Sequence, residues 1–106
     1  MSNSGNSVKN EEIREVAIGD ITASYVALGP PLEHDAFRIT FTNDTDANIY
    51  FTVDPLVNTR KAAASTARVL DDKTNDMYTK AGTQFYIKYE TVPGIGTGAW
   101  LEIEYV

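Results

Sequence analysis

A histidine and two pairs of carboxylates are the side chains whose type and spacing first suggest chemistry. His34 lies between Glu33 and Asp35, and a histidine beside a carboxylate can act as a general base or bind a metal ion. It is the only histidine of the chain, and it follows two prolines in a polar loop with no nucleophile motif nearby. We therefore expect His34 to be a loop residue without a catalytic role.

Glu102 and Glu104 form the second candidate, because they lie two residues apart near the end of the chain. On one face of a strand they would be roughly 7 Å apart, a spacing compatible with the carboxylate pair of a glycosidase. A strand face exposed to solvent has the same pattern, and so small a protein offers no cleft. We predict no enzymatic activity, no catalytic residue and no cofactor.

Two further segments resemble ligand-binding loops only in part. Asp44-x-Asp46-x-Asn48 begins like a calcium loop, but its sixth position is Ile49 and its twelfth is Pro55, where glycine and glutamate are required. The glycine-rich segment 94–98 precedes a predicted strand, so no helix N-terminus is available for an anion. We expect a turn and a strand connection, and no metal site.

These residues must be positioned by β-strands. Residues 36–54 alternate apolar and polar side chains on both sides of the segment Asn43-Asp44-Thr45-Asp46, a pattern typical of a β-hairpin. Further strands are predicted at 21–28, 67–72, 83–90 and 99–106, and residues 13–18 are predicted to form a short strand or one helical turn. Residues 55–66 and 92–98 are predicted to connect strands.

Six to seven short strands predict an all-β fold, namely an antiparallel β-sandwich or a partly open barrel. One set of alternating side chains is predicted to form its core: Ile39, Phe41, Ile49, Phe51, Val53, Phe85, Ile87, Leu101 and Ile103. Residues 13–106 would be this single domain. Residues 1–12 are polar apart from Met1 and Val8, so we predict an N-terminal arm that a partner protein holds in place.

Composition narrows the set of partners. Fifteen acidic and nine basic residues give a net charge of −6, which opposes binding to a nucleic-acid backbone. The chain has no cysteine, and the sequence shows neither a signal peptide nor an apolar stretch of the length that a membrane helix needs. We expect a protein that is made in a cytoplasm and binds neither nucleic acid nor membrane.

Outward-facing aromatic side chains are the strongest indication of an interaction. If the predicted core is right, Tyr50, Tyr86 and Trp100 point away from it, each on a strand. Exposed aromatic side chains are typical of protein interfaces and of platforms on which sugars stack. Together with Val8 of the arm, we predict these three residues to bind a partner, with protein preferred over sugar.

Several segments resemble small virion structural proteins of tailed bacteriophages. In those proteins a strand that ends in Asn-x-Thr-Asp is followed by a strand that ends in aspartate, and later by a Gly-Thr-Gln-aromatic strand. The resemblance covers roughly residues 21–106, with Pro55 where such proteins often have glycine, and its segments are YVALG (25–29), FRI (37–39), TNDTDAN (42–48), FTVD (51–54), VLD (69–71), TN (74–75) and GTQFYIK (82–88). It implies a non-enzymatic protein of the head surface, the head-to-tail junction or the tail.

The expected function is therefore that of a virion structural component, assembled in the cytoplasm of the host bacterium. Its expected partners are other virion proteins and copies of itself. The alternative is a carbohydrate-binding β-sandwich that uses Trp100, Tyr50 or Tyr86, either as a module by itself or as a receptor-binding part of the tail. A small hydrolase that uses His34 or the Glu102 and Glu104 pair is a distant third interpretation.

Overall fold

The structure is a computed structural model of the chain, and it describes residues 8–58, 60–71 and 79–106. These residues contain nine strands and a short 3-10 turn at Ile18–Asp20. The strands are β1 (Lys9–Asn10), β2 (Arg14–Ala17), β3 (Val26–Ala27), β4 (Ala36–Thr45), β5 (Ile49–Thr52), β6 (Arg60–Ala62), β7 (Thr66–Asp71), β8 (Tyr86–Tyr89) and β9 (Gly96–Tyr105).

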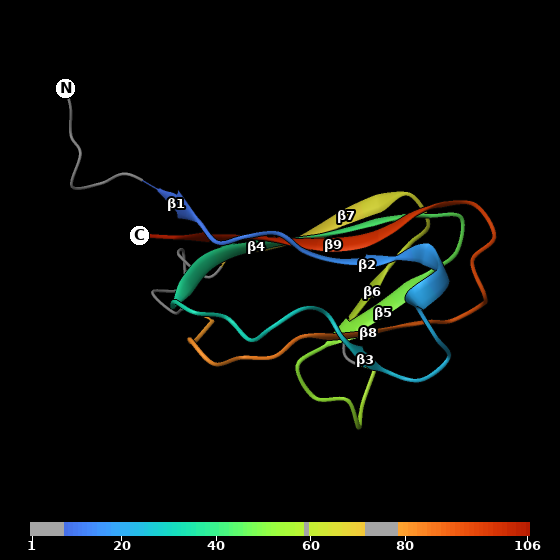
Figure 1. Cartoon of the computed structure of the whole chain (residues 1–106), viewed down its shortest axis with the longest axis horizontal. Helices are drawn as coiled ribbons and strands as arrows, with labels where there is room; N and C mark the ends of the chain where they lie inside the picture. Colours follow the sequence, from blue (N-terminus) through green and yellow to red (C-terminus); the bar gives the residue numbers. More distant parts are fainter. Residues whose placement is uncertain (1–7, 59, 72–78) are drawn as a thin grey trace.

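The strands form two sheets that lie face to face (Figure 1). Sheet A has the order β1-β9-β4-β7, with β2 also paired to β9, and sheet B has the order β3-β8-β5-β6. Every pairing is antiparallel. The prediction of an antiparallel β-sandwich is confirmed, and the sheets do not close into a barrel.

The core lies between the sheets and includes eight of the nine side chains that the alternation predicts to point inward, together with buried residues outside that prediction: Ile21, Leu28, Leu32, Ala36, Ala62 and Ala99. Phe41 of sheet A and Phe51 of sheet B stack with ring centroids 4.3 Å apart. Val53 is an exception, since its side chain is 54% exposed. Strand β5 ends at Thr52, whose hydroxyl bonds both the N–H and the carbonyl of Asp54, so the alternation stops before Val53.

The predicted hairpin of residues 36–54 is wrong in its pairing. Both strands exist, but β4 pairs with β7 and β9, whereas β5 pairs with β6 and β8. The connection between them therefore crosses from one sheet to the other. The alternating pattern of β4 and β5 does not distinguish a hairpin from two strands in facing sheets. In both arrangements each strand presents one apolar face to the same core.

The side chain of Asn43 explains why the chain turns into the other sheet. Asn43 is fully buried, and its amide nitrogen donates to the carbonyls of Ala47, Ala62 and Ala63 at 2.7–3.1 Å. Its carbonyl oxygen accepts from the N–H and the hydroxyl of Thr45. Residues that the sequence suggests as turn formers thus lie inside β4 and bind the backbone at the crossing.

Other boundaries also differ from the predictions. Only Val26 and Ala27 of the predicted strand 21–28 pair in a sheet, and β6 lies within the predicted loop 55–66. Strand β9 begins at Gly96, inside the predicted glycine-rich connection. Gly98 has φ +144°, and a Cβ atom there would lie 2.1 Å from the carbonyl oxygen of Val16, so glycine permits β2 to pair here.

The described part of the predicted arm lies against the sandwich. Strand β1 pairs with the end of β9, with Lys9 opposite Tyr105, and the side chain of Glu11 is buried. Strand β1 therefore extends sheet A, and residues 1–7 of the predicted arm lie outside the described residues.

Candidate functional site

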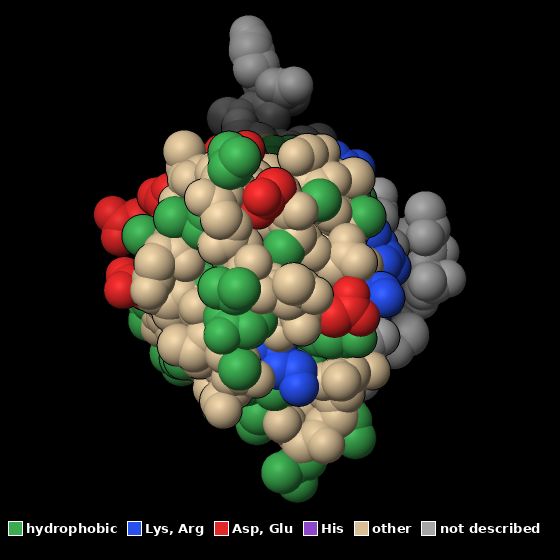
Figure 2. Space-filling model, turned by 90° about the vertical axis from the view of Figure 1, so that its right-hand side faces the viewer, with side chains coloured by type: hydrophobic (Ala, Val, Ile, Leu, Met, Phe, Trp, Pro, Cys, Tyr) green, Lys and Arg blue, Asp and Glu red, His purple; other side chains and the backbone are tan. Residues whose placement is uncertain are grey.

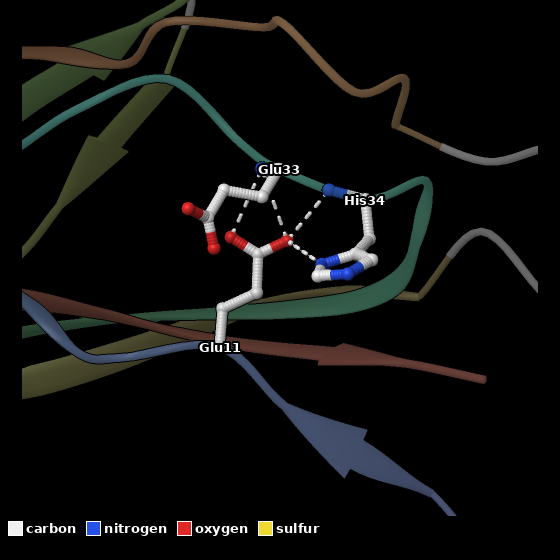
Figure 3. Close-up of side chains that lie close together, drawn as sticks. All are labelled: Glu11, Glu33 and His34. Carbon is white, nitrogen blue, oxygen red and sulfur yellow. Dashed lines mark hydrogen bonds and ion pairs between the residues drawn. The ribbon is translucent and has the colours of Figure 1, made fainter.

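Glu11 is the centre of a polar cluster that joins the N-terminal segment to the loop before β4 (Figure 3). Its carboxylate is fully buried and accepts hydrogen bonds from the backbone N–H groups of Glu33 and His34. The Nη2 atom of Arg14 lies 2.7 Å from Glu11 Oε1, and Arg14 is also almost completely buried. Two buried charges are tolerated here because each is paired and hydrogen-bonded.

His34 is oriented by this cluster. Its Nδ1 atom lies 3.0 Å from Glu11 Oε2, and its ring stacks on Tyr105 with centroids 3.7 Å apart. Burial raises the pKa of the Glu11 carboxyl, but the hydrogen bonds from Glu33 and His34 and the charge of Arg14 outweigh it, so this pKa is lowered overall. An imidazole held by a carboxylate can exchange protons. Here the contacts between His34 and Glu11 also fix the loop before β4 to the N-terminal segment.

The cluster also fits a metal site only in part. One ligand atom each of Glu11, Glu33 and His34 lie within 4.8 Å of one another. However, the Glu11 oxygens already accept from four nitrogen donors, among them the cationic Arg14. A cation would have to displace these donors, so the contacts favour a structural role for Glu11.

Arg14 and Gly29 complete the fastening of the loop. The guanidinium of Arg14 donates to the carbonyls of Pro30 and Pro31 at 3.4 and 3.1 Å, and also to that of Glu12. Gly29 has φ +70°, and a Cβ atom there would lie 2.3 Å from Cγ of Arg14. Sequence reasoning missed this cluster, although the alternation in 13–18 places Arg14 on the same face as the apolar Val16.

The four predicted partner-binding residues fall on three parts of the molecule. Val8 is 50% exposed and precedes β1. Tyr50 and Tyr86 share the outer face of sheet B, where Tyr50 is opposite Lys88 and Tyr86 is opposite Thr52. Trp100 lies on the outer face of sheet A, opposite Thr42. The fold thus brings the two tyrosines together and places Trp100 on the opposite side of the sandwich.

The outer face of sheet B carries a tyrosine-lysine cluster formed by Tyr25, Tyr50, Lys61, Lys88 and Glu90. The Nζ atom of Lys88 lies 4.9 Å from the ring centroid of Tyr25 and 5.6 Å from that of Tyr50. The Tyr50 hydroxyl donates to Glu90 at 2.9 Å, and this bond raises the pKa of Tyr50. Cation–π contacts with Lys88 fix the positions of the Tyr25 and Tyr50 rings on this face. The sequence did not indicate that Tyr25 belongs to the cluster.

Trp100 is half-buried between two shallow hollows on the outer face of sheet A. One hollow of about 270 Å³ is lined by Ile13, Glu15 and Trp100. The other, of about 240 Å³, lies between Trp100 and the segments 42–44 and 65–67. The indole Nε1 donates to Glu102 at 3.1 Å, which fixes the ring on the sheet.

The two carboxylates considered for glycoside hydrolysis have protein partners. Glu102 accepts the Trp100 hydrogen bond, and Glu104 lies 3.6 Å from the guanidinium of Arg38. Both residues lie on the open outer face of sheet A, because Glu102 is opposite Thr40 and Glu104 is opposite Arg38. Their contacts favour roles in holding neighbouring side chains.

The acidic segment that resembles a calcium loop binds neighbouring chain segments. Asp46 accepts from the N–H groups of Gly94 and Ile95 at 2.8 and 3.1 Å, which lowers its pKa. Asp44 accepts from the Thr97 hydroxyl, and Asn48 bonds Glu90 and the N–H of Ala64. The three side chains therefore serve separate connections and do not form a common ligand set.

Comparison with known proteins assigns no family to the chain. Among the described residues, no helix has the length and apolar character needed to cross a membrane. No protein-family model, curated protein or solved structure matches the chain.

Proposed function

We propose that this protein is a non-enzymatic structural component of a tailed-phage virion that packs against neighbouring virion proteins. The observation that carries the proposal is the presence of partly exposed aromatic side chains on both outer faces of the sandwich. Trp100 lies on sheet A, and Tyr50 and Tyr86 lie on sheet B. A component with neighbours on two sides needs two such contact surfaces.

The polar clusters support the same proposal. Glu11 and His34 would be the first choice for acid-base chemistry, but the Glu11 carboxylate accepts from Arg14 and from the N–H of His34. The His34 ring contacts Glu11 through Nδ1 and stacks on Tyr105. Their contacts hold the N-terminal segment on the sheet, so they stabilise the shape that a neighbour would contact. The kind of particle is proposed from the resemblance that the sequence segments between residues 21 and 106 carry.

Quantitative mass spectrometry of purified virions tests this proposal. The phage that encodes the chain is grown and purified by density gradient, and the chain is expected in the particles at a fixed copy number. Particles complemented with Trp100→Ala or Tyr50→Ala should retain fewer copies. Val92→Ala, which changes a 67% exposed side chain in the connection before β9, is the matched control. Abundant chain in the infected cell but none in the virions would refute the proposal.

A carbohydrate-binding module is the second candidate, and the surroundings of Trp100 favour it. An aromatic ring between two hollows, with Glu15 and Thr42 beside it, provides the stacking surface and the hydrogen-bonding groups that a sugar needs. A glycan array with the wild-type chain and Trp100→Ala separates the two candidates. Saturable binding that Trp100→Ala abolishes would establish the carbohydrate module.

A further inference from the structure

Trp100 and Glu15 lie side by side on the outer face of sheet A. They are directly opposite each other on β9 and β2, so their side chains leave the sheet on the same face. Together with Ile13, which is 55% exposed, they line the hollow of about 270 Å³. Among the residues that the structure describes, Glu15 is exposed and has neither a hydrogen-bond nor an ion-pair partner. The hollow is therefore bordered by a carboxylate that is available to a ligand.

The side chains around this hollow make the outer face of sheet A acidic. The registers of β2, β4 and β9 place four acidic side chains and one basic side chain on this face: Glu15, Asp44, Glu102, Glu104 and Arg38. Arg38 lies 3.6 Å from Glu104, so its charge is matched there and not at Glu15. Acidic and basic side chains are also separated over the surface seen end-on, where they gather at opposite margins (Figure 2). Such a distribution attracts a partner with a basic surface.

The chemistry of the hollow selects a cationic hydrogen-bond donor. A carboxylate only accepts hydrogen bonds, so a group that binds Glu15 must donate them. The Nε1–H of Trp100 already donates to Glu102, so the indole presents its electron-rich face to a ligand. The guanidinium of arginine fits both groups, because its N–H groups pair with a carboxylate and its flat face stacks on an aromatic ring. Ile13 provides an apolar surface for the aliphatic part of such a side chain.

The charge of the whole chain indicates where the arginine comes from. Fifteen acidic and nine basic residues give a net charge of −6, so two copies of this chain repel each other. A different protein with a basic surface is attracted to the same face. We therefore consider a neighbouring protein, and not a second copy, as the occupant of the hollow.

We propose that an arginine side chain of a neighbouring virion protein binds in the hollow between Trp100 and Glu15. Its guanidinium lies on the indole ring and donates to the Glu15 carboxylate. This inference rests on the proposed function and specifies the chemistry of the neighbour on the side of sheet A.

A titration followed by nuclear magnetic resonance tests the site directly. Trp100 is the only tryptophan of the chain, so its indole N–H gives a single signal that reports on the hollow. The full chain is titrated with the blocked peptide Gly-Arg-Gly and with the same peptide in which citrulline, an uncharged analogue of the same shape, replaces arginine. We expect the arginine peptide to shift the signal saturably and the citrulline peptide to bind roughly tenfold more weakly. In 500 mM NaCl the arginine peptide should bind more weakly, because salt screens exposed charges.

The substitution Glu15→Gln tests the carboxylate. It should weaken binding of the arginine peptide roughly two- to fivefold, because the amide carries no charge. Glu33→Gln removes an exposed carboxylate outside the hollow and is the matched control, and circular dichroism confirms that both variants fold. In complemented virions, Glu15→Gln should lower the copy number of the chain, whereas Glu33→Gln should not.

The inference would be overturned by an indole signal that ignores the arginine peptide, by equal binding of the arginine and citrulline peptides, or by equal affinities of the two variants. An indole signal that responds to neutral oligosaccharides and not to the arginine peptide would overturn it in favour of the carbohydrate module. A chain that is present in virions but does not bind the arginine peptide would overturn the inference alone. A chain that binds this peptide through Glu15 but is absent from virions would overturn the proposed function, while the arginine site would stand.

Discussion

The substitution Asn43→Ala should strongly destabilise the protein at the crossing between the sheets. Asn43 makes three donated and two accepted hydrogen bonds in a fully buried position. The carbonyls of Ala47 and Ala63 keep a second donor, since they also accept from the hydroxyls of Thr45 and Thr66.

The expected magnitude follows from the two remaining partners of Asn43. The Ala62 carbonyl and the Thr45 N–H each lose a hydrogen bond in the interior, at a cost of about 1.5 kcal/mol each. The free energy of unfolding should therefore fall by about 3 kcal/mol, a large fraction of the 5–15 kcal/mol or so that is typical of a domain. Asn43→Asp should cost more, because a charged oxygen would then face three carbonyls.

Urea unfolding followed by circular dichroism measures this loss. The midpoint should shift while the slope of the free energy against urea concentration stays constant. Thr45→Val is the matched control, because it removes a hydroxyl from the same network but leaves Asn43 bound to the three carbonyls, and it should cost about 1 kcal/mol. A loss below about 1 kcal/mol for Asn43→Ala would refute the role given to this side chain.

Three further predictions concern the loop and the core. Gly29→Ala should lower the free energy of unfolding in urea by about 1–3 kcal/mol, because φ is +70° and the new Cβ would meet Arg14. Gly82→Ala is the control, because Gly82 has φ +90° with open space around it, so its loss measures the backbone strain without the steric clash. Glu11 has a lowered pKa in the folded state, so the stability that it contributes is present above about pH 4.5 and is lost as the pH falls further. Glu11→Gln should therefore lower the melting temperature at pH 7 by more than at pH 3, and an equal difference at both pH values would contradict this. Phe51→Ala should cost about 3–5 kcal/mol because it leaves a cavity beside Phe41, whereas Phe51→Leu should cost less than half as much because leucine still fills most of that volume; equal losses would show that the ring stacking, and not the filled volume, determines the cost.

The contacts of Glu11, Arg14 and His34 could not be predicted from the sequence. The sequence predicts an arm for Glu11, a short strand or one helical turn for Arg14, and a polar loop for His34. Their contacts join residues more than fifteen positions apart, through backbone groups of Glu33, Pro30 and Pro31. No local pattern identifies such a partner, because the backbone donors and acceptors are the same for every residue type.

The sequence by itself determined where most strands lie and which side chains face the core. Alternation with period two records the difference between the two faces of a strand, so Ile39, Phe41 and Leu101 could be placed without a structure. It also showed Tyr50, Tyr86 and Trp100 to be on outward faces. Only the tertiary structure decided that β4 and β5 lie in different sheets and that Trp100 is on the side opposite to the tyrosines. The physical reason is that strand pairing depends on backbone groups and on the buried hydrogen bonds of Asn43, which periodicity does not record.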